Sequence, residues 1–306
     1  MEISPGSIAA VDHEQKAAHE LELLLTTPDA EQSAKIRRTE LAPGAWGAGV
    51  DAFVLSNVLT EAECGALVAR SERLGYSFWD PDERRADFRS AHTVEFEQRA
   101  FSARLWARVA PHVTAAVELA QGQPQWETEL TGRWEAAGVN HHHLFARYRG
   151  GGHFSPHTDG YVVETLNRRS LYSALVYLNR CERGGRTRLL RLSEWQPFEK
   201  DEKGRFRAPE SSVVADAEVV AGDVLFFYQT VVHEGEPVAE GHEKYIIRTD
   251  LMFDRAPRIC TAPADLEAFA LMQEAELLEA TDAAAAAVLF RRCARLSPAL
   301  CDLYGW

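Results

Sequence analysis

The sequence lacks long apolar runs, a secretory leader and paired cysteines. No stretch approaches the roughly 18–20 apolar residues that a membrane-spanning helix requires. The N-terminal stretch MEISPGSIAAVDHEQK has no basic region followed by an apolar one, as a secretory signal would have. The five cysteines are odd in number, scattered and without a Cys-x-x-Cys pair, so neither a disulfide framework nor a thiolate zinc site is expected. We therefore expect a protein of the reducing cytoplasm.

Positive charge is also in short supply. The chain carries 33 Lys and Arg against 46 Asp and Glu, a formal net charge of −13. That balance argues against nucleic acid and anionic membranes as partners. Apolar residues make up 46% and charged residues 26%, which excludes wholesale disorder and a fibrous repeat. With 306 residues, the chain can bury a sizeable core without disulfides or a structural metal.

The first half of the chain predicts an extension followed by mixed elements. Residues 1–50 are expected to form an N-terminal extension, with a helical pattern in EQKAAHELELLL and a Gly/Pro-rich joint at its end. A domain is expected over 51–256. Within it, 52–59 predicts a strand, and 60–75 predicts a helix with an N-capping threonine and a C-terminal glycine. A second helical pattern covers roughly 96–120.

From about residue 141 to 253 the texture becomes that of a β protein. Short β-branched or aromatic runs such as SLYSALVYLN, DVLFFYQTVV and KYIIRTDLMF are separated by turns that contain glycine or proline. Many short strands of this kind predict an antiparallel sandwich or barrel. The expected fold class is a mainly β core with flanking helices.

Residues 263–306 predict a helical hairpin, with the second helix ending at Ser297-Pro298. The segment resembles a single tetratricopeptide-like unit. One such unit cannot form a solenoid, because each repeat needs a neighbour to bury its apolar face. We therefore expect the hairpin to pack on the β core through its apolar stripes.

The chemistry-bearing pattern is a histidine and an aspartate two positions apart, His157 and Asp159. Residues two apart on a strand point to the same face, so the imidazole and the carboxylate converge. His233 follows 74 positions after Asp159, behind the run DVLFFYQTVV. Two histidines and one carboxylate can occupy one face of an octahedron and leave the other open, as non-haem Fe(II) requires. Zinc accepts the same ligands, and each residue alone is more often an ordinary core or surface residue.

From about residue 140 to 253 the sequence resembles the prolyl 4-hydroxylase-type Fe(II)/2-oxoglutarate dioxygenases. The matching stretches are RYRGGGHFSPHTDG, LVYLN, RGGRT, VVAGDVLFF and HEGEPVAEGHEKYIIRTDLMF, in the family's order and at its spacing. The resemblance implies a double-stranded β-helix, or jelly roll, that uses Fe(II), 2-oxoglutarate as co-substrate and O2. It also implies His157, Asp159 and His233 as the iron ligands. Relatives that halogenate lack this carboxylate, so Asp159 favours hydroxylation.

The resemblance further implies residues for the co-substrate. Tyr148 and Tyr177 stand where the family places tyrosines that reach 2-oxoglutarate. Lys244 matches the basic residue that pairs with the distal carboxylate of 2-oxoglutarate, and Arg248 follows four positions later. The interval from His233 to Lys244 is one residue longer than the commoner family value, so both cations stay candidates, with a lead for Lys244. On a strand, both would face the same side.

Two residues have weaker claims to contact the substrate. His142 shares strand parity with Tyr148 and takes the place of an arginine that relatives often carry. Arg89 lies in a region where relatives often have an arginine near the substrate mouth, although a solvated face is the favoured explanation.

The expected activity is hydroxylation of an unactivated C–H bond, with conversion of 2-oxoglutarate to succinate and CO2. An amino acid-like small molecule or a natural-product intermediate is favoured as substrate, because the sequence has no signal of an extended peptide groove. One alternative is a protein hydroxylase acting on prolyl or other side chains, with the C-terminal hairpin as its docking surface. Another is a catalytically idle jelly-roll binding module. Desaturation and cyclisation remain open as reactions.

Overall fold

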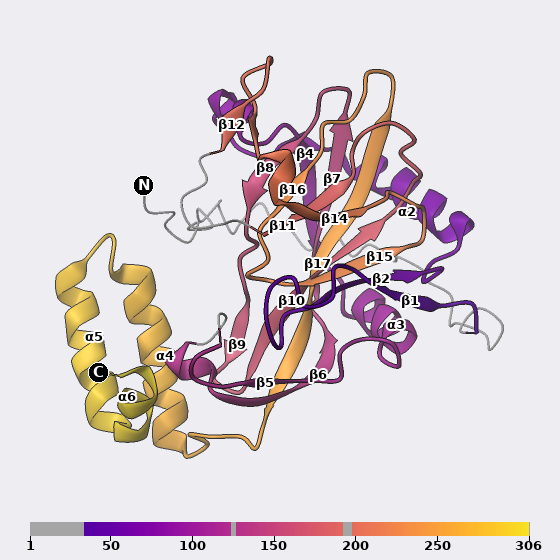
Figure 1. Cartoon of the computed structure of the whole chain (residues 1–306). Coiled ribbons are helices and arrows are strands. Elements are labelled where there is room, and N and C mark those ends of the chain that lie inside the picture. Colours follow the sequence, from indigo (N-terminus) through magenta and orange to yellow (C-terminus); the bar gives the residue numbers. More distant parts are fainter. Residues whose placement is uncertain (1–33, 124–126, 192–197, 306) are drawn as a thin grey trace. The chain divides into compact units, whose positions relative to one another are not determined.

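The computed structural model describes residues 34–123, 127–191 and 198–305 (Figure 1). Most of the expected N-terminal extension, with its helical pattern, lies outside the described residues. The chain divides into two compact units. The first comprises Met1–Val113, Gly138–Tyr161 and Ser170–Met252, and the second comprises Thr114–Ala137, Val162–Arg169 and Phe253–Trp306. The domain boundaries expected from the sequence stay a prediction.

The first unit holds most of the strands. Its elements before residue 113 are β1 (Arg37–Glu40), β2 (Ala52–Ser56), α2 (Glu61–Leu74), β3 (Ser77–Phe78), η1 (Glu83–Asp87), β4 (His92–Glu97) and α3 (Arg99–Val109). Those that follow are β7 (His142–Arg149), β8 (Phe154–His157), β10 (Arg168–Tyr177), β11 (Thr187–Leu190), β12 (Glu199–Lys200), β13 (Phe206–Arg207), η3 (Glu210–Ser212), β14 (Val213–Ala217), β15 (Val224–Tyr228), β16 (His233–Gly235) and β17 (Glu243–Ala256).

Two antiparallel sheets organise most of these strands, while β12 and β13 pair with each other in a separate two-stranded sheet. The larger one runs in the order β1-β2-β15-β10-β17-β7-β4-β3, and the smaller one in the order β14-β11-β16-β8. The expected short strands of the core are therefore present, and the fold is the jelly roll with flanking helices that the sequence predicts. The crossovers bring strands far apart in the sequence next to each other, as β10 lies between β15 and β17.

The helix expected after Thr60 forms as α2. The Thr60 hydroxyl accepts from the backbone N–H of Glu63 at 3.2 Å, and the Glu63 carboxylate accepts from the backbone N–H of Thr60 at 2.9 Å. This reciprocal pair is a capping box. Glu63 also forms a buried ion pair of 2.6 Å with Arg108, which links α2 to α3.

The prediction of a helix over roughly 96–120 is wrong at both ends. Only Arg99–Val109 is helical, and the flanks belong to β4 and to β5 (Ala116–Leu119). In β4, buried Phe96 stands between exposed Glu95 and Glu97, which is the alternation of a strand with one face covered. Pairing with β7 decides the conformation of this segment, because it satisfies the backbone groups of β4 along a neighbouring strand.

The second unit combines strands with three C-terminal helices. Its elements are β5, η2 (Thr128–Leu130), β6 (Gly132–Val139), β9 (Val163–Thr165), α4 (Pro263–Leu278), α5 (Ala283–Leu296) and α6 (Pro298–Tyr304). The expected hairpin forms as α4 and α5, but the expected end at Ser297-Pro298 is the start of α6. The Ser297 hydroxyl caps α6 by accepting from the N–H of Leu300, and Pro298 takes the first helical position.

The helices of the second unit share one apolar cluster. It contains Phe269 and Met272 from α4, Cys293 from α5 and Leu300 from α6, together with Leu166 of the segment after β9. Packing of the hairpin on the β core stays a prediction. Among the described helices, none is both long and apolar enough to cross a membrane.

Candidate metal centre

The three residues singled out as metal ligands come together between two neighbouring strands of the smaller sheet. His157 of β8 and His233 of β16 are directly opposite each other in register, and Asp159 lies two residues beyond His157. The Nε2 atoms of the two histidines lie 3.7 Å and 3.8 Å from the Asp159 carboxylate oxygens. One ligand atom from each residue can be chosen so that all three lie within 4.8 Å of one another.

The hydrogen bonds of both imidazoles engage Nδ1 and leave Nε2 free to bind a metal. His157 Nδ1 lies 2.7 Å from its neighbouring Ser155 carbonyl, and His233 Nδ1 lies 3.1 Å from that of Val231. A carbonyl oxygen can only accept, so Nδ1 carries the proton and Nε2 keeps its lone pair for a metal. Burial lowers the pKa of both histidines, so both are neutral at pH 7.

Asp159 supplies the negative charge. Burial opposes its ionisation, but the Arg248 guanidinium, 3.7 Å away, holds the pKa of its carboxyl well below the usual range. Its Oδ2 is buried and has no hydrogen-bond partner. A buried, ionised carboxylate oxygen beside two neutral Nε2 lone pairs fits a divalent cation by charge and by ligand type.

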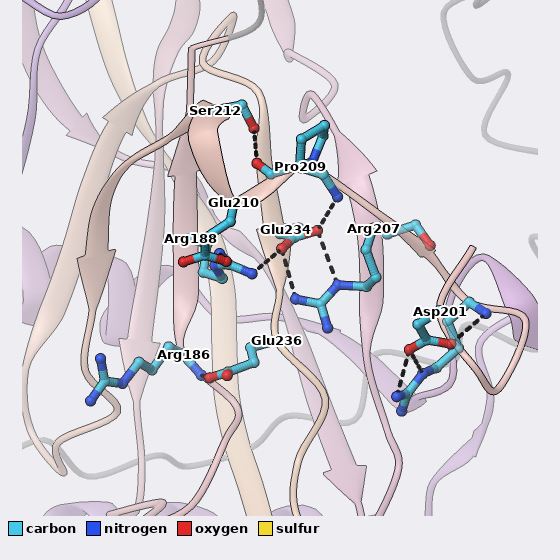
Figure 2. A network of polar contacts seen from close by, with 12 residues as sticks. Arg186, Arg188, Asp201, Arg207, Pro209, Glu210, Ser212, Glu234 and Glu236 are labelled. Atoms are coloured by element: carbon cyan, nitrogen blue, oxygen red, sulfur yellow. Dashed lines mark hydrogen bonds and ion pairs between the residues drawn. The ribbon is translucent and has the colours of Figure 1, made fainter. Parts of the chain in front are cut away.

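A buried ion-pair cluster packs against β16, the strand that carries His233, on the face opposite this histidine. Because side chains alternate along β16, Glu234 points away from His233. Its fully buried carboxylate accepts from Arg188 at 3.0 Å, from Arg207 at 2.7 Å and from the Ala208 N–H at 3.0 Å (Figure 2). We call Glu234, Arg188 and Arg207 the arginine clamp. It joins β16 to β11 and β13, and these contacts restrict the position of the backbone next to His233.

The centre opens into a cavity of about 320 Å³ between the two sheets of the first unit. Tyr148, Lys244 and Arg248 from the larger sheet line it, together with Arg89 and the three candidate ligands. The alternation expected for the strand around Lys244 is present, because Lys244, Ile246 and Arg248 all face this cavity.

Lys244 is a buried cation with no ion pair to any described carboxylate. Its Nζ donates to the Gly185 carbonyl at 2.6 Å and lies 5.6 Å from the ring centres of both Tyr148 and Tyr177. Burial lowers the pKa of Lys244 to about 8. A charge in such a place is costly unless an anion meets it.

Arg248 has different surroundings from Lys244. Its guanidinium donates to the Gly160 carbonyl at 2.8 Å and lies 3.1 Å from Asp250 and 3.7 Å from Asp159. At about 3.4 Å per residue, four positions along β17 separate the Cα atoms of the two residues by roughly 14 Å. Arg248 is therefore paired with two carboxylates, one of them the candidate metal ligand.

The remaining predicted residues differ in their access to the cavity. Tyr177 is fully buried, and its hydroxyl donates to Thr187 at 2.9 Å, while Thr187 itself lines the cavity. His142 is not among the lining residues. It lies 3.4 Å from Glu95 on the neighbouring strand. Arg89 does line the cavity, beside the rings of Trp79 and Phe154.

Sequence reasoning missed two lining residues that help to shape the centre. Thr187 contacts both Tyr177 and Lys244, and the Phe154 ring stacks on His157 with centres 3.5 Å apart. Thr187 closes the family-like stretch RGGRT, which was the available signal. Phe154 lies three positions before His157 on β8, so strand parity alone does not place its ring beside the imidazole.

Comparison with known proteins finds a family model for the part of the chain that holds the candidate site. Residues 143–249 match the model of the 2OG-Fe(II) oxygenase superfamily, a range that includes all three candidate ligands, Lys244 and Arg248. This part of the chain is therefore similar to oxygenases that use Fe(II), 2-oxoglutarate and O2.

Several solved structures are similar to this chain. A Pseudomonas putida prolyl-4-hydroxylase has 18% identity and a TM-score of 0.42, over 73% of this chain and 98% of that one. A Trichoplax adhaerens prolyl hydroxylase in complex with a hypoxia inducible factor peptide has 15% identity and a TM-score of 0.41, over 71% and 88%. The non-heme α-ketoglutarate-dependent carbocyclase SnoK from nogalamycin biosynthesis has 14% identity and a TM-score of 0.40, over 74% and 84%. No curated protein matches the chain.

Proposed function

We propose that this chain is a 2-oxoglutarate-dependent dioxygenase that hydroxylates an unactivated C–H bond of an amino acid-like small molecule or a natural-product intermediate, with conversion of 2-oxoglutarate to succinate and CO2. The observation that carries the proposal is the convergence of two neutral Nε2 atoms and one ionised carboxylate on a cavity that also holds Lys244, a cation without an ion pair among the described residues.

His157, Asp159 and His233 would hold the iron. Their support is the Nδ1–H donation of both histidines to backbone carbonyls and the unsatisfied Oδ2 of Asp159. Bound Fe(II) and 2-oxoglutarate would supply the activation of O2 that no protein side chain can provide. The chain's own contribution is to fix the ligand rings, exclude water from the cavity and present the substrate.

Lys244 would bind the distal carboxylate of 2-oxoglutarate. A carboxylate beside Nζ would offset the unfavourable free energy of burying an unpaired ammonium group. Tyr148, whose ring lies next to Lys244, would contact the same carboxylate. Tyr177 would act through Thr187, to whose oxygen it donates. Arg248 is already engaged by Asp159 and Asp250, so its contribution would be to hold the metal-binding carboxylate in place.

The cavity volume of about 320 Å³ suits a co-substrate together with a small molecule or one side chain. We favour the small molecule, and hydroxylation of a protein side chain is the alternative outcome of the test below. An idle binding module would have no use for a complete ligand set beside an unpaired buried cation. A cytoplasmic setting is supported by the cysteines, all five of which are free.

The test is anaerobic titration of the metal-free protein with Fe(II), then 2-oxoglutarate, followed by a substrate screen that reads succinate release. The wild-type protein should bind one Fe(II) and then 2-oxoglutarate. Asp159→Ala and His233→Ala should lose stoichiometric iron retention and remain folded, because two ligands hold the ion too weakly against water and buffer. His112→Ala, which removes a histidine outside the cavity, is the matched control. Normal substrate-coupled turnover by Asp159→Ala would exclude the proposed centre.

A further inference from the structure

The charges around the cavity are unbalanced once the proposed function is granted. The lining contains three cations, Arg89, Lys244 and Arg248, but only one carboxylate, Asp159. Both histidines place Nδ1 against a backbone carbonyl, which leaves Nε2 as an uncharged ligand atom. Iron would add two positive charges, and 2-oxoglutarate would add two negative ones. Among the groups in ion-pair contact with the lining cations, Asp159 and Asp250 offset two more positive charges, which leaves an excess of one.

Arg89 is the lining cation to which this unbalanced positive charge belongs. Lys244 would be neutralised by 2-oxoglutarate, and Arg248 already lies 3.1 Å from Asp250 and 3.7 Å from Asp159. Among the described residues, no carboxylate forms an ion pair with Arg89. Its Nε is buried and has no hydrogen-bond partner.

Aromatic rings and backbone contacts hold Arg89 at the cavity. Its guanidinium carbon lies 4.6 Å from the centre of the Phe154 ring and 5.5 Å from that of Trp79. A β-bridge to Phe154 fixes its backbone, and the Trp79 indole N–H donates to its carbonyl at 2.5 Å. Contact with aromatic faces positions a guanidinium but leaves its in-plane N–H groups available for an acceptor.

We infer that the substrate carries a carboxylate that binds Arg89, and that it is a small monocarboxylic acid rather than a free amine or a neutral peptide segment. This inference rests on the proposed function. A guanidinium pairs with a carboxylate through two parallel hydrogen bonds, which fixes both position and orientation. The lining offers no second carboxylate for an ammonium group, since Asp159 faces the metal position and Arg248. A substrate amine would therefore be acylated, absent or left in solvent.

The experiment is calorimetric binding to the anaerobic Fe(II)–2-oxoglutarate enzyme. The probes are straight-chain and phenyl-substituted monocarboxylates, their methyl esters and the matching amines. We expect the acids to bind at least tenfold more tightly than the esters and amines. Arg89→Ala and Arg89→Gln should abolish that preference, and Arg89→Lys should retain part of it. In the aerobic reaction, the acids that bind should raise succinate release in the wild-type enzyme but not in Arg89→Ala or Arg89→Gln.

Arg85→Ala is the matched control. Arg85 belongs to the same segment and also lies over the Trp79 ring, at 5.0 Å, but it is exposed, pairs with Asp80 and does not line the cavity. Its loss should leave the preference for acids unchanged. Thermal unfolding of each variant verifies that it is folded.

Three results would overturn the inference. One is equal binding of acids and esters by the wild-type enzyme, and another is an unchanged preference in both Arg89→Ala and Arg89→Gln. The third is succinate release driven by a neutral prolyl peptide while no acid acts. The binding of 2-oxoglutarate is measured first, so the two proposals fail differently. A wild-type protein that does not bind it refutes the proposed function, whereas one that binds it but ignores acids refutes only the role of Arg89.

Discussion

At the scale of single residues, the cavity is notable for where it places charge. Lys244 is 4% exposed, and its ammonium contacts a carbonyl, a hydroxyl and two aromatic faces but pairs with no described carboxylate. The unfolded chain would hydrate this ammonium fully. The ligand-free fold therefore carries a cost that an anion in the cavity would remove.

Because Lys244 is buried, folding stability and 2-oxoglutarate affinity should change in opposite directions as pH rises. Burial lowers the pKa of Lys244 from 10.5 to about 8, so between these values the unfolded chain binds more protons than the folded one. The stability of the ligand-free protein should rise as pH increases through this window. The affinity for 2-oxoglutarate should fall over the same range, by up to about tenfold per pH unit, because the charged ammonium is the form that binds.

The measurements are unfolding midpoints and 2-oxoglutarate isotherms of the anaerobic Fe(II) protein from about pH 6.5 to about pH 9.5. Lys244→Met should bind 2-oxoglutarate weakly at every pH and lose the dependence, while its iron binding stays near that of the wild type. Retention of the wild-type pH profile by Lys244→Met would assign the co-substrate to another cation.

The sequence predicts some of these residues and not others, for physical reasons. The shared face of Lys244 and Arg248 follows from the two-residue period of a strand. The convergence of His157 with Asp159 was expected on the same ground, but β8 ends at His157, so the segment after the strand places Asp159. The partners of Arg248 do not follow from local sequence. Its pairing with Asp159 requires the fold to bring together residues 89 positions apart. Nor does periodicity place Arg89, whose orientation comes from the rings of Trp79 and Phe154.

At the scale of elements, the short strand β16 depends on its neighbours. It has three residues, pairs with β11 and β8, and carries His233 on one face and the arginine clamp on the other. A strand this short has few backbone hydrogen bonds of its own to fix its position. The buried charges of the clamp supply part of what fixes it.

Loss of the clamp should therefore affect both stability and the metal. Glu234→Ala leaves Arg188 and Arg207 without their buried partner, which should cost about 3–5 kcal/mol of unfolding free energy. The milder Glu234→Gln should lower the unfolding midpoint less and still weaken Fe(II) retention, because His233 follows the backbone of β16. Chemical denaturation and iron titration measure the two effects.

Glu236→Gln is the control, since Glu236 stands two positions further on and is partly exposed. Its effect should stay within about 0.5 kcal/mol, as for an ordinary surface change. If Glu234→Gln unfolds and binds iron like the wild type, the clamp does not position His233.

The elements that the sequence misjudged were decided by long-range contacts. The segment before α3 contains good helix formers, yet it pairs with β7, which lies some 50 positions away. Helix α6 was missed because Ser297-Pro298 is a stop signal for the preceding helix and an equally good start signal for the next one. Local pattern alone does not distinguish these two uses.

At the scale of the whole molecule, the C-terminal helices account for much of the apolar core of the second unit. Phe269, Met272, Cys293 and Leu300 cluster with Leu166, which comes from a different part of the chain. Deletion from Asp265 onward would expose Leu166 and the partly buried Val163. We expect the truncated protein to be insoluble or to unfold at a clearly lower temperature, for lack of this buried apolar surface.

Expression yield, sedimentation and thermal unfolding of the truncated chain measure this effect. A docking role for the helices makes the contrary prediction, because a truncated enzyme would then stay folded and still turn over a small isolated substrate. A soluble product with a single cooperative transition at the wild-type temperature would favour docking.

The register of β8 and β16 also sets the order of events when the protein is made. The nascent chain offers the pair His157 and Asp159 long before the ribosome reaches His233, 74 positions later. That pair supplies two ligands, whereas the third arrives only when the non-local β8–β16 ladder closes. Contacts of such long sequence separation form late, since loop closure must precede them. Under the proposed ligand set, iron capture would follow folding, and the geometry of the finished sheet would select the ion.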